Sequence, residues 1–437
     1  MSELAAVVGL GRYGGGLGLT RHLLINGHRV RLFDLLPEEE LAEYLKELAP
    51  WQDKLETVFG PHELKDFEGI SKCYLNPAVP WAGGLADKLR DGGFELSSDI
   101  ECFFENWKLP VIGLTGSNGK STCWEMMSKL LTDWSCGGNR GVSVFDMRQD
   151  DVKGCLLELS SFQLERIQHR FSISMVTTFT PDHLDQHGDI ESYRLAKERV
   201  SAFQKEEDLC VLGRGLGSWP TLAKTLMLGR DFDFEGQTLV FSDGRFGVSE
   251  FPLVGGHNKD LLALAIAASR RALGDDVLLQ QRLNKLCEDG MKPLPYRQNI
   301  ISKTPVTIVN DSKATTPEST ICAIEAFTSS EHCLHLICGG KEKELDVAGI
   351  VTALKKTRFK LYVIGEQVER WRQTAAGLPF EDCGNLKAAI DVITKNIVAG
   401  DALLFSPGTS SFDQYKNYKD RGEDFDHLVQ KVLTKGF

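Results

Sequence analysis

The sequence lacks several features that would each indicate a particular class of protein. None of its apolar runs approaches the roughly 18 residues that a membrane-spanning helix needs, and its N-terminus has no charged segment followed by an apolar one, as a signal peptide would. The 11 cysteines are odd in number and never form a Cys-x-x-Cys pair, which argues against a disulfide framework and a structural zinc site. We therefore expect a cytoplasmic protein with reduced thiols and no membrane insertion.

Basic residues are too few and too scattered for a nucleic-acid binder. The 50 Lys and Arg are outnumbered by 61 Asp and Glu, for a formal net charge of -11, whereas nucleic-acid phosphates are bound by a basic face. Hydrophobic residues make up 42% of the chain, which is typical of a globular protein. A chain of 437 residues is too long for one ordinary core. We expect about three domains, no nucleic-acid partner and a monomer.

Strands and helices alternate along the whole chain, which predicts an α/β fold of mostly parallel sheets. The alternating pattern begins again near residue 107, and once more after "DGMKPLPYRQN", whose prolines and glycine are typical of a hinge. We predict three domains at residues 1–106, 107–293 and 294–437. The first and last would be Rossmann-like, and the central one would be a parallel sheet of the P-loop ATPase type.

A glycine-rich turn follows the first predicted strand. Gly9, Gly11 and Gly14 fit the pattern G-x-G-x-x-G, and Asp34 ends the next strand, where dinucleotide-binding folds place an acid that binds a ribose. The spacing itself requires only a close approach of the backbone to a diphosphate at a helix N-terminus. Three interpretations therefore stay open: an NAD-dependent oxidoreductase, a protein that binds a UDP-type ligand, and a purely structural turn.

A second glycine turn, "TGSNGKST", lies between a predicted strand at 111–114 and a helix. It departs from the usual P-loop pattern G-x-x-x-x-G-K-[ST], because Leu114 stands at the position of the first glycine. Its glycines still let backbone amides converge on a phosphate, Lys120 supplies a positive charge, and Ser121 can coordinate Mg²⁺. The predicted nucleotide-binding residues are Gly116, Ser117, Asn118, Gly119, Lys120, Ser121 and Thr122.

Two segments further along carry candidate metal ligands. Glu158 ends an apolar strand, at the sheet edge where ligands of α/β proteins collect, and could bind Mg²⁺. His183 and His187 stand four residues apart, but the segment is not the H-E-x-x-H of zinc proteases. Beside Glu158 and a P-loop, a second magnesium site is the better interpretation of His183. Lys197, on a predicted helix, is by pattern alone a solvent-facing lysine.

Three polar segments follow predicted strands in the last domain, namely "VNDSKATTPEST", "GGKEKELD" and "SPGTSSFDQYKNY". The first gathers Asp311, Lys313 and Thr315 in one turn, and hydroxyl groups with Lys343 could hold a carboxylate. Capping of the loops alone is the alternative explanation for each segment.

Together these segments resemble the Mur ligase family, ATP-dependent enzymes that form amide bonds in peptidoglycan precursor synthesis. The resemblance extends over all three predicted domains. The segments "LELSSFQLE", "NDSKATT" and "SFDQYKNYKDRG" are most similar to the branch that adds D-glutamate to UDP-N-acetylmuramoyl-L-alanine. It implies that the substrate carboxylate attacks the γ-phosphate of ATP to give an acyl phosphate. The amino group of glutamate then displaces phosphate through a tetrahedral intermediate, leaving ADP and phosphate.

The resemblance also implies ATP and two Mg²⁺ ions as cofactors, and roles for individual residues. Lys120, His183 and Lys197 would be catalytic, with Lys197 carbamylated so that it stabilises the second Mg²⁺. The metal ligands would be Ser121, Glu158, His183 and Lys197. Further nucleotide contacts would come from Asn258, Arg297, Asp311 and Lys313. The two other substrates would contact Gly11, Asp34, Asn139, Gln163, His183, Thr315, Lys343, Ser411, Phe412 and Tyr418.

The chain departs from the usual pattern of the family at several positions. "PYR" stands in place of "PHR", "SPGTSS" in place of "SPACAS", and Tyr418 in place of a phenylalanine. The tyrosine adds a hydroxyl to the predicted acceptor pocket, so an acceptor such as L-glutamate stays open. An NAD-dependent oxidoreductase and an ATP-hydrolysing switch are the alternatives from other classes.

Overall fold

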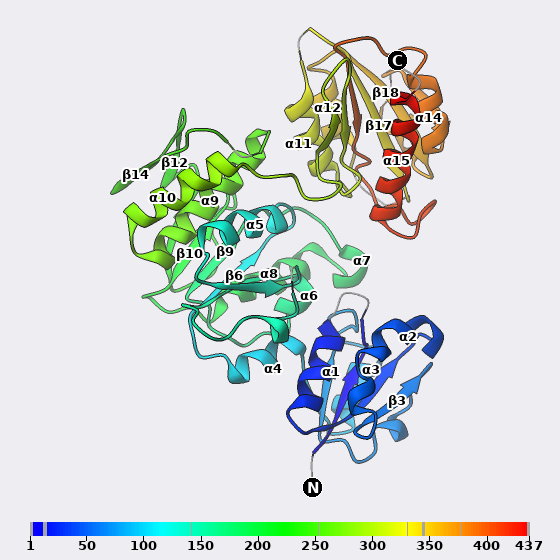
Figure 1. The fold of residues 1–437 in the computed structure, drawn as a ribbon. Helices are drawn as coiled ribbons and strands as arrows, with labels where there is room; N and C mark the ends of the chain where they lie inside the picture. The colour runs from blue at the N-terminus through cyan, green and yellow to red at the C-terminus, as the bar shows by residue number, and fades with distance from the viewer. Residues whose placement is uncertain are drawn as a thin grey trace. The chain divides into compact units, whose positions relative to one another are not determined.

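The computed structural model describes residues 3–11, 15–140, 142–251, 253–329, 331–342, 346–375 and 377–434. The chain divides into two compact units. The first comprises Met1–Val248 and Leu261–Lys285, and the second comprises Ser249–Asp260 and Leu286–Phe437. Two large parallel sheets lie in the first unit and one mostly parallel sheet lies in the second (Figure 1). The predicted α/β fold is confirmed, with one large sheet in each of the three predicted ranges.

The N-terminal sheet has the strand order β3-β2-β1-β4-β5, and all of its pairs are parallel. Its strands are β1 (Leu4–Val8), β2 (Arg29–Asp34), β3 (Leu55–Phe59), β4 (Lys72–Leu75) and β5 (Glu95–Ser97). Its helices are α1 (Gly15–Ile25), α2 (Glu38–Lys46), α3 (Gly84–Asp91) and α4 (Asp99–Asn106). The strand order changes direction at β1, so the carboxyl ends of β1 and β4 mark the edge where such folds bind ligands.

Helix α1 packs against β1 at close range because Gly16 has no side chain. A Cβ built on Gly16 would lie 2.1 Å from the carbonyl oxygen of Gly9 and 2.6 Å from that of Leu10. Both obstacles are backbone atoms of the turn, which cannot move aside as a flexible side chain would. The glycine at this position therefore fixes the distance between the helix and the turn that precedes it.

The middle sheet is also parallel, with the order β11-β10-β9-β6-β8-β7. Its strands are β6 (Val111–Thr115), β7 (Ser135–Gly138), β8 (Cys155–Glu158), β9 (Ile173–Val176), β10 (Leu209–Leu212) and β11 (Lys224–Met227). Its helices are α5 (Lys120–Leu130), α6 (Ser161–Leu164), α7 (Leu184–His187), α8 (Ile190–Ala202), α9 (Gly256–Leu273, in this unit from Leu261) and α10 (Asp276–Asp289). A small antiparallel sheet adds β12 (Phe232–Glu235), β13 (Thr238–Phe241) and β14 (Gly244–Gly247).

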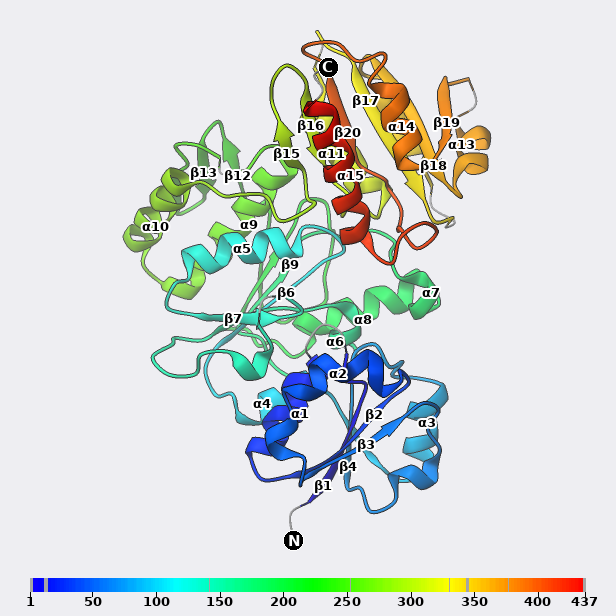
Figure 2. The ribbon, with the colours of Figure 1, turned by 45° about the vertical axis from the view of Figure 1, so that its right-hand side comes forward.

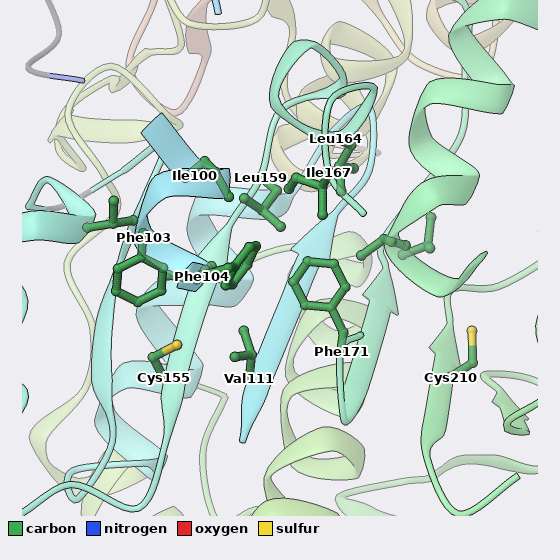
Figure 3. Packing of buried hydrophobic residues seen from close by; sticks show 14 of the residues in the cluster. Ile100, Phe103, Phe104, Val111, Cys155, Leu159, Leu164, Ile167, Phe171 and Cys210 are labelled. Carbon is green, nitrogen blue, oxygen red and sulfur yellow. The ribbon is translucent and has the colours of Figure 1, made fainter. Parts of the chain in front are cut away.

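Helix α4 connects the two sheets of the first unit through its side chains. Ile100 and Phe103 lie in the same buried cluster as Val111 and Phe171 of the middle sheet region (Figure 3). Cys102, between them on the helix, lies in the cluster of the N-terminal sheet instead. One short helix thus contributes to both cores, which explains why the two sheets form one compact unit.

The second unit contains a sheet of order β15-β16-β20-β17-β18-β19, in which only the β15 pair is antiparallel. Its strands are β15 (Asn299–Ser302), β16 (Thr307–Asn310), β17 (Leu334–Gly340), β18 (Phe359–Gly365), β19 (Phe380–Gly384) and β20 (Ala402–Phe405). Its helices are α11 (Pro317–Phe327), α12 (Ala348–Leu354), α13 (Val368–Thr374), α14 (Leu386–Ile393) and α15 (Tyr418–Leu433). Helices α11 and α12 share one core cluster, and α14 and α15 share another. Strand β19 lies at an edge of the sheet (Figure 2).

No helix in the described ranges is both long enough and apolar enough to span a bilayer.

Replacing Gly16 with alanine should destabilise the N-terminal sheet. The added Cβ would collide with backbone oxygens at 2.1 and 2.6 Å, and such overpacking costs about 1–3 kcal/mol. Urea unfolding followed by circular dichroism would measure the loss. Gly247→Ala is the control, because a Cβ there would meet nothing within 4 Å. Equal unfolding midpoints for the two variants would contradict the packing argument.

Candidate functional site

The turn between β6 and α5 has the shape of a phosphate-binding loop. Gly116 and Gly119 have φ values of +145° and +82°, and a Cβ on Gly116 would lie 2.0 Å from the hydroxyl oxygen of Thr177. Gly119 caps the N-terminus of α5, where unpaired backbone N–H groups and the helix dipole attract an anion. Both glycines are needed for the backbone to take this course.

The segment after β9 fixes the loop from the side. The backbone N–H of Ser117 donates to the carbonyl of Thr178 (2.8 Å), and that of Asn118 donates to the Thr178 hydroxyl (2.9 Å). The Ser117 hydroxyl donates to the carbonyl of Thr180 (2.8 Å) and lies 3.0 Å from the hydroxyl of Tyr193. The side chain of Ser117 therefore supports the loop from within, and a phosphate would meet the backbone of the loop.

Two lysines reach the same carbonyl of this loop. Lys120 Nζ donates to the carbonyls of Gly116 (2.6 Å) and Ser117 (2.9 Å), and Lys197 Nζ donates to that of Gly116 (2.9 Å). Lys197 is only 1% exposed, which corrects the pattern-based expectation of a solvent-facing lysine. Burial, and then the charge of Lys120, lower the pKa of Lys197 well below its usual value.

Glu158 lies beside the first turn of α5 with an unsatisfied oxygen. Its side chain is 2% exposed, and Oε1 accepts hydrogen bonds from Ser121 Oγ (3.3 Å) and Asn139 Nδ2 (3.2 Å). Oε2 is buried and has no hydrogen-bond partner among the described residues. A carboxylate oxygen next to a serine hydroxyl is the donor set that Mg²⁺ takes beside phosphates. Ser121 and Glu158 therefore fit the predicted magnesium site.

Side chains of the protein alone do not form a closed metal cage here. Within the part of the chain that the structure describes, no group of three or more His, Cys, Asp or Glu could hold a metal ion. This is expected for Mg²⁺ in a nucleotide site, where phosphate and water oxygens complete the coordination.

The two histidines of "TPDHLDQH" differ in their surroundings. His183 caps the N-terminus of α7 with φ of +53°, its side chain is 47% exposed, and Nε2 lies 3.4 Å from Asp182. His187 is buried, lies 2.9 Å from the Ser161 hydroxyl and stacks on Phe162. The metal role of His183 stays a prediction. His187 is a packed histidine.

Gln163 and Asp34, both predicted substrate contacts, have local structural roles. Gln163 Oε1 accepts from the backbone N–H of Ser160 (3.1 Å) in a capping box of α6. Asp34 accepts from the backbone N–H groups of Leu10 (2.8 Å) and Leu36 (3.0 Å) through its two oxygens. Asp34 therefore stabilises the glycine turn, which is a different role from the ribose contact typical of NAD sites.

The glycine turn of the N-terminal sheet is close to Asn76. Gly11 has φ of +75°, and a Cβ on it would lie 2.7 Å from Asn76 Nδ2. Gly14 lies outside the described residues. Asn76 follows β4, and no sequence pattern marked it as a candidate.

In the second unit, Asp311 is buried below the "NDSKATT" turn. It accepts from the Ser406 hydroxyl (2.8 Å) and the backbone N–H of Gln298 (3.1 Å). Burial raises the pKa of Asp311 to about 7, although these hydrogen bonds and Arg297 oppose the shift. Lys313 Nζ lies 3.9 Å from the centre of the Tyr418 ring, so the structure brings these two predicted site residues together.

The remaining candidates of the second unit are dispersed among its loops. Asn258 Nδ2 donates to the carbonyl of Val254 (2.6 Å) near the start of α9. Thr315 is half-buried, Ser411 is buried and Phe412 is exposed. Lys343 lies outside the described residues.

Arg421 is a residue of this unit that the sequence patterns did not single out. Its buried guanidinium donates to Ser312 Oγ (3.1 Å) and to the carbonyls of Ser312 (2.9 Å) and Thr409 (3.0 Å). Arg421 therefore connects the segment "NDSKATT" to the segment "SPGTSS" through hydrogen bonds. The sequence feature that could have identified Arg421 is its position within the segment "KNYKDRG".

Comparisons with known proteins agree with this geometry. The model of the Mur ligase middle domain matches residues 114–216, and the model of the Mur ligase, glutamate ligase domain matches residues 296–408. The UDP-N-acetylmuramoylalanine–D-glutamate ligase of Desulfovibrio desulfuricans is 32% identical to this chain, over 99% of this chain and 97% of that protein. The ligase of that name from Solibacter usitatus is 30% identical, over 99% and 98%.

Solved structures share the fold. The MurF ligase of Thermotoga maritima, in complex with ADP, has a TM-score of 0.59 at 18% identity and covers 99% of this chain and 95% of its own. MurF of Acinetobacter baumannii has a TM-score of 0.61 at 14% identity and covers 91% and 90%. At this level of identity the likeness concerns the fold alone.

Lys120→Ala should lower ATP turnover by about 100-fold or more, because it removes a positive charge placed at the phosphate loop. Phosphate release with saturating ATP, Mg²⁺ and the two other substrates would measure the loss, and thermal unfolding would show that the variant is folded. Lys129→Ala is the matched control, since Lys129 is an exposed residue at the other end of α5. Unchanged turnover in Lys120→Ala would refute the phosphate role.

Proposed function

The chain belongs to the Mur ligase family, and from this premise we propose that it joins D-glutamate to UDP-N-acetylmuramoyl-L-alanine in peptidoglycan precursor synthesis. Members of this family are ATP-dependent ligases that form amide bonds, and the similarity to D-glutamate ligases extends over 99% of the chain. The observation that carries the proposal is the pairing of Ser121 with the buried, half-satisfied carboxylate of Glu158 at the phosphate loop.

The chemistry explains why a phosphate loop belongs in an amide-forming enzyme. A carboxylate is a poor electrophile, and transfer of the γ-phosphoryl group gives it a leaving group that the amino group of glutamate displaces. The carboxylate and the triphosphate are both anions, so the site needs cationic charge to bring them together. Backbone N–H groups at Gly119 and the α5 terminus, with Lys120, would bind the phosphates. Ser121 and Glu158 would hold Mg²⁺, which supplies further positive charge.

Two alternatives have less support. An NAD-dependent oxidoreductase would use Asp34 for the ribose, but both oxygens of Asp34 accept from backbone N–H groups. An ATP-hydrolysing switch would leave the second unit without a role, although that unit brings Lys313 and Tyr418 together. The switch predicts turnover that does not depend on an amino acid, which the assay below measures.

Several further predictions from the sequence belong to this proposal. We propose the domain limits 1–106, 107–293 and 294–437, a monomer, and a cytoplasmic location. The substrate, nucleotide and metal contacts predicted from the sequence are part of the same proposal.

We further propose that Lys197 is carbamylated. Carbon dioxide reacts with a neutral amine, giving a carbamate and a proton, and the lowered pKa of Lys197 shifts it toward the neutral form. The modification would place a negative charge on Lys197 near the positive charge of Lys120 at the Gly116 carbonyl. An anion there could also attract a second Mg²⁺.

Purified protein with ATP, Mg²⁺ and UDP-N-acetylmuramoyl-L-alanine should release phosphate only when D-glutamate is added. Phosphate release would be followed with D-glutamate, L-glutamate and no amino acid, and mass spectrometry would identify the product. A preference for L-glutamate would keep the ligase chemistry and change the acceptor. Equal release without any amino acid would instead favour the switch.

Lys197→Ala should abolish ligation, and short carboxylates such as formate or acetate should restore part of it by occupying the place of the carbamate. The rate would be measured against carboxylate concentration. Lys205→Ala, at an exposed lysine, should neither lose activity nor respond to added carboxylate. Inactivity of Lys197→Ala at every carboxylate concentration would count against the carbamate.

A further inference from the structure

An arginine from the middle sheet region binds the backbone of the N-terminal sheet. Arg166 follows α6, is 4% exposed, and donates from Nη1 to the carbonyls of Leu75 (2.7 Å) and Asn76 (3.0 Å). Its Nη2 donates to the carbonyl of Val79. All three carbonyls belong to the segment "LNPAVPW", which starts at the end of β4. One buried side chain thus connects the two sheets of the first unit at a single loop.

The loop that Arg166 binds lies beside the glycine turn of the N-terminal sheet. The backbone N–H of Asn76, the first residue after β4, donates to the carbonyl of Val8 (2.9 Å). The amide nitrogen of the Asn76 side chain would lie 2.7 Å from a Cβ on Gly11 and 3.7 Å from one on Gly15. These glycines precede and begin α1, whose N-terminus is where a diphosphate would bind. The position of Asn76 therefore shapes that site.

The loop has few bonds of its own. Pro77 and Pro80 have no backbone N–H, while Ala78 and Val79 donate only within the loop, to Asn76 Oδ1 (3.0 Å) and its carbonyl (2.9 Å). The hydrogen bonds from Arg166 are consequently a large share of what fixes the loop in place.

The charge of Arg166 is kept despite its burial. Burial lowers the pKa of Arg166 to about 10, and Glu165 and Asp99 oppose the shift, so the group is cationic at neutral pH. Its Nε is buried without a hydrogen-bond partner among the described residues, which costs stability. A buried guanidinium that lacks one hydrogen bond contributes little to stability by itself, because apolar side chains often fill such positions with no loss of stability.

We propose that Arg166 is a positioning residue for the UDP-linked substrate. Its guanidinium fixes the 75–81 loop, and through Asn76 the diphosphate site, relative to the sheet that carries the phosphate loop for ATP. The proposal rests on the proposed function, since it assumes that a UDP-linked substrate binds at the glycine turn. It does not assign Arg166 a contact with the reacting atoms.

Arg166→Met and Arg166→Lys would test it by separating binding from catalysis. We expect KM for UDP-N-acetylmuramoyl-L-alanine to rise about 10–100-fold in Arg166→Met, since small misplacements of a positioned substrate cost up to about 100-fold. KM for ATP and kcat at saturation should stay within about 3-fold, because the phosphate loop makes no bond to Arg166. Arg166→Lys should be intermediate, since lysine keeps the charge but loses the forked set of donors.

Arg90→Met is the matched control. Both arginines stack on the Trp81 ring, at 4.9 Å for Arg166 and 5.1 Å for Arg90, and Arg90 donates to the carbonyl of Trp81. Arg90 belongs to α3 of the N-terminal sheet, so its removal breaks no bond between the two sheets. We expect the KM of Arg90→Met for the UDP-linked substrate to stay within about 2-fold of the KM of the unmodified protein.

Hydrogen exchange of the backbone amides of residues 75–82 measures how firmly Arg166 fixes the loop, and it does not require catalytic turnover. We expect faster exchange at Ala78 and Val79 in Arg166→Met and no change in Arg90→Met. An unchanged KM, or equal losses in kcat and both KM values with a lower melting temperature, would overturn the proposal. If the original protein forms no ligation product, the proposed function fails, and the exchange rates alone decide whether Arg166 fixes the loop.

Discussion

A buried carboxylate that the protein does not fully satisfy is the constraint on which the rest of the site depends. Glu158 ends β8 inside the sheet, and among the residues that the structure describes only one of its oxygens has a hydrogen-bond partner. Burying a charge in this way is costly unless a cation completes the arrangement. The neighbouring Ser121 and the N-terminus of α5 provide what a magnesium-bound phosphate needs. Binding of nucleotide and metal at the proposed site would recover this free energy.

The two lysines at the phosphate loop also place charged groups close together inside the fold. Lys120 and Lys197 both donate to the carbonyl of Gly116, and two full charges at one acceptor repel. Burial of Lys197 and the nearby charge of Lys120 both lower the pKa of Lys197 well below its usual value. The two lysines at this loop therefore differ in how readily each one carries a positive charge.

Charged groups inside the fold also determine how its loops are held. Arg421 joins two loops of the second unit, and Arg166 joins the two sheets of the first unit, each through backbone carbonyls. Helix α4 reinforces the second connection with apolar contacts to both cores. A guanidinium can satisfy several carbonyls at once, which suits it to places where loops without regular structure meet.

The sequence by itself determined the α/β alternation, the phosphate loop and the family, because these depend on local periodicity and on short motifs with fixed spacing. It could not place Lys197, which its pattern puts on a solvated helix face and the fold buries at Gly116. It gave no sign of Asn76 or Arg166, and it left the role of Asp34 open between a nucleotide ligand and a structural turn. Only the tertiary structure decided these points, since each depends on a partner that the chain brings into contact from a distant segment.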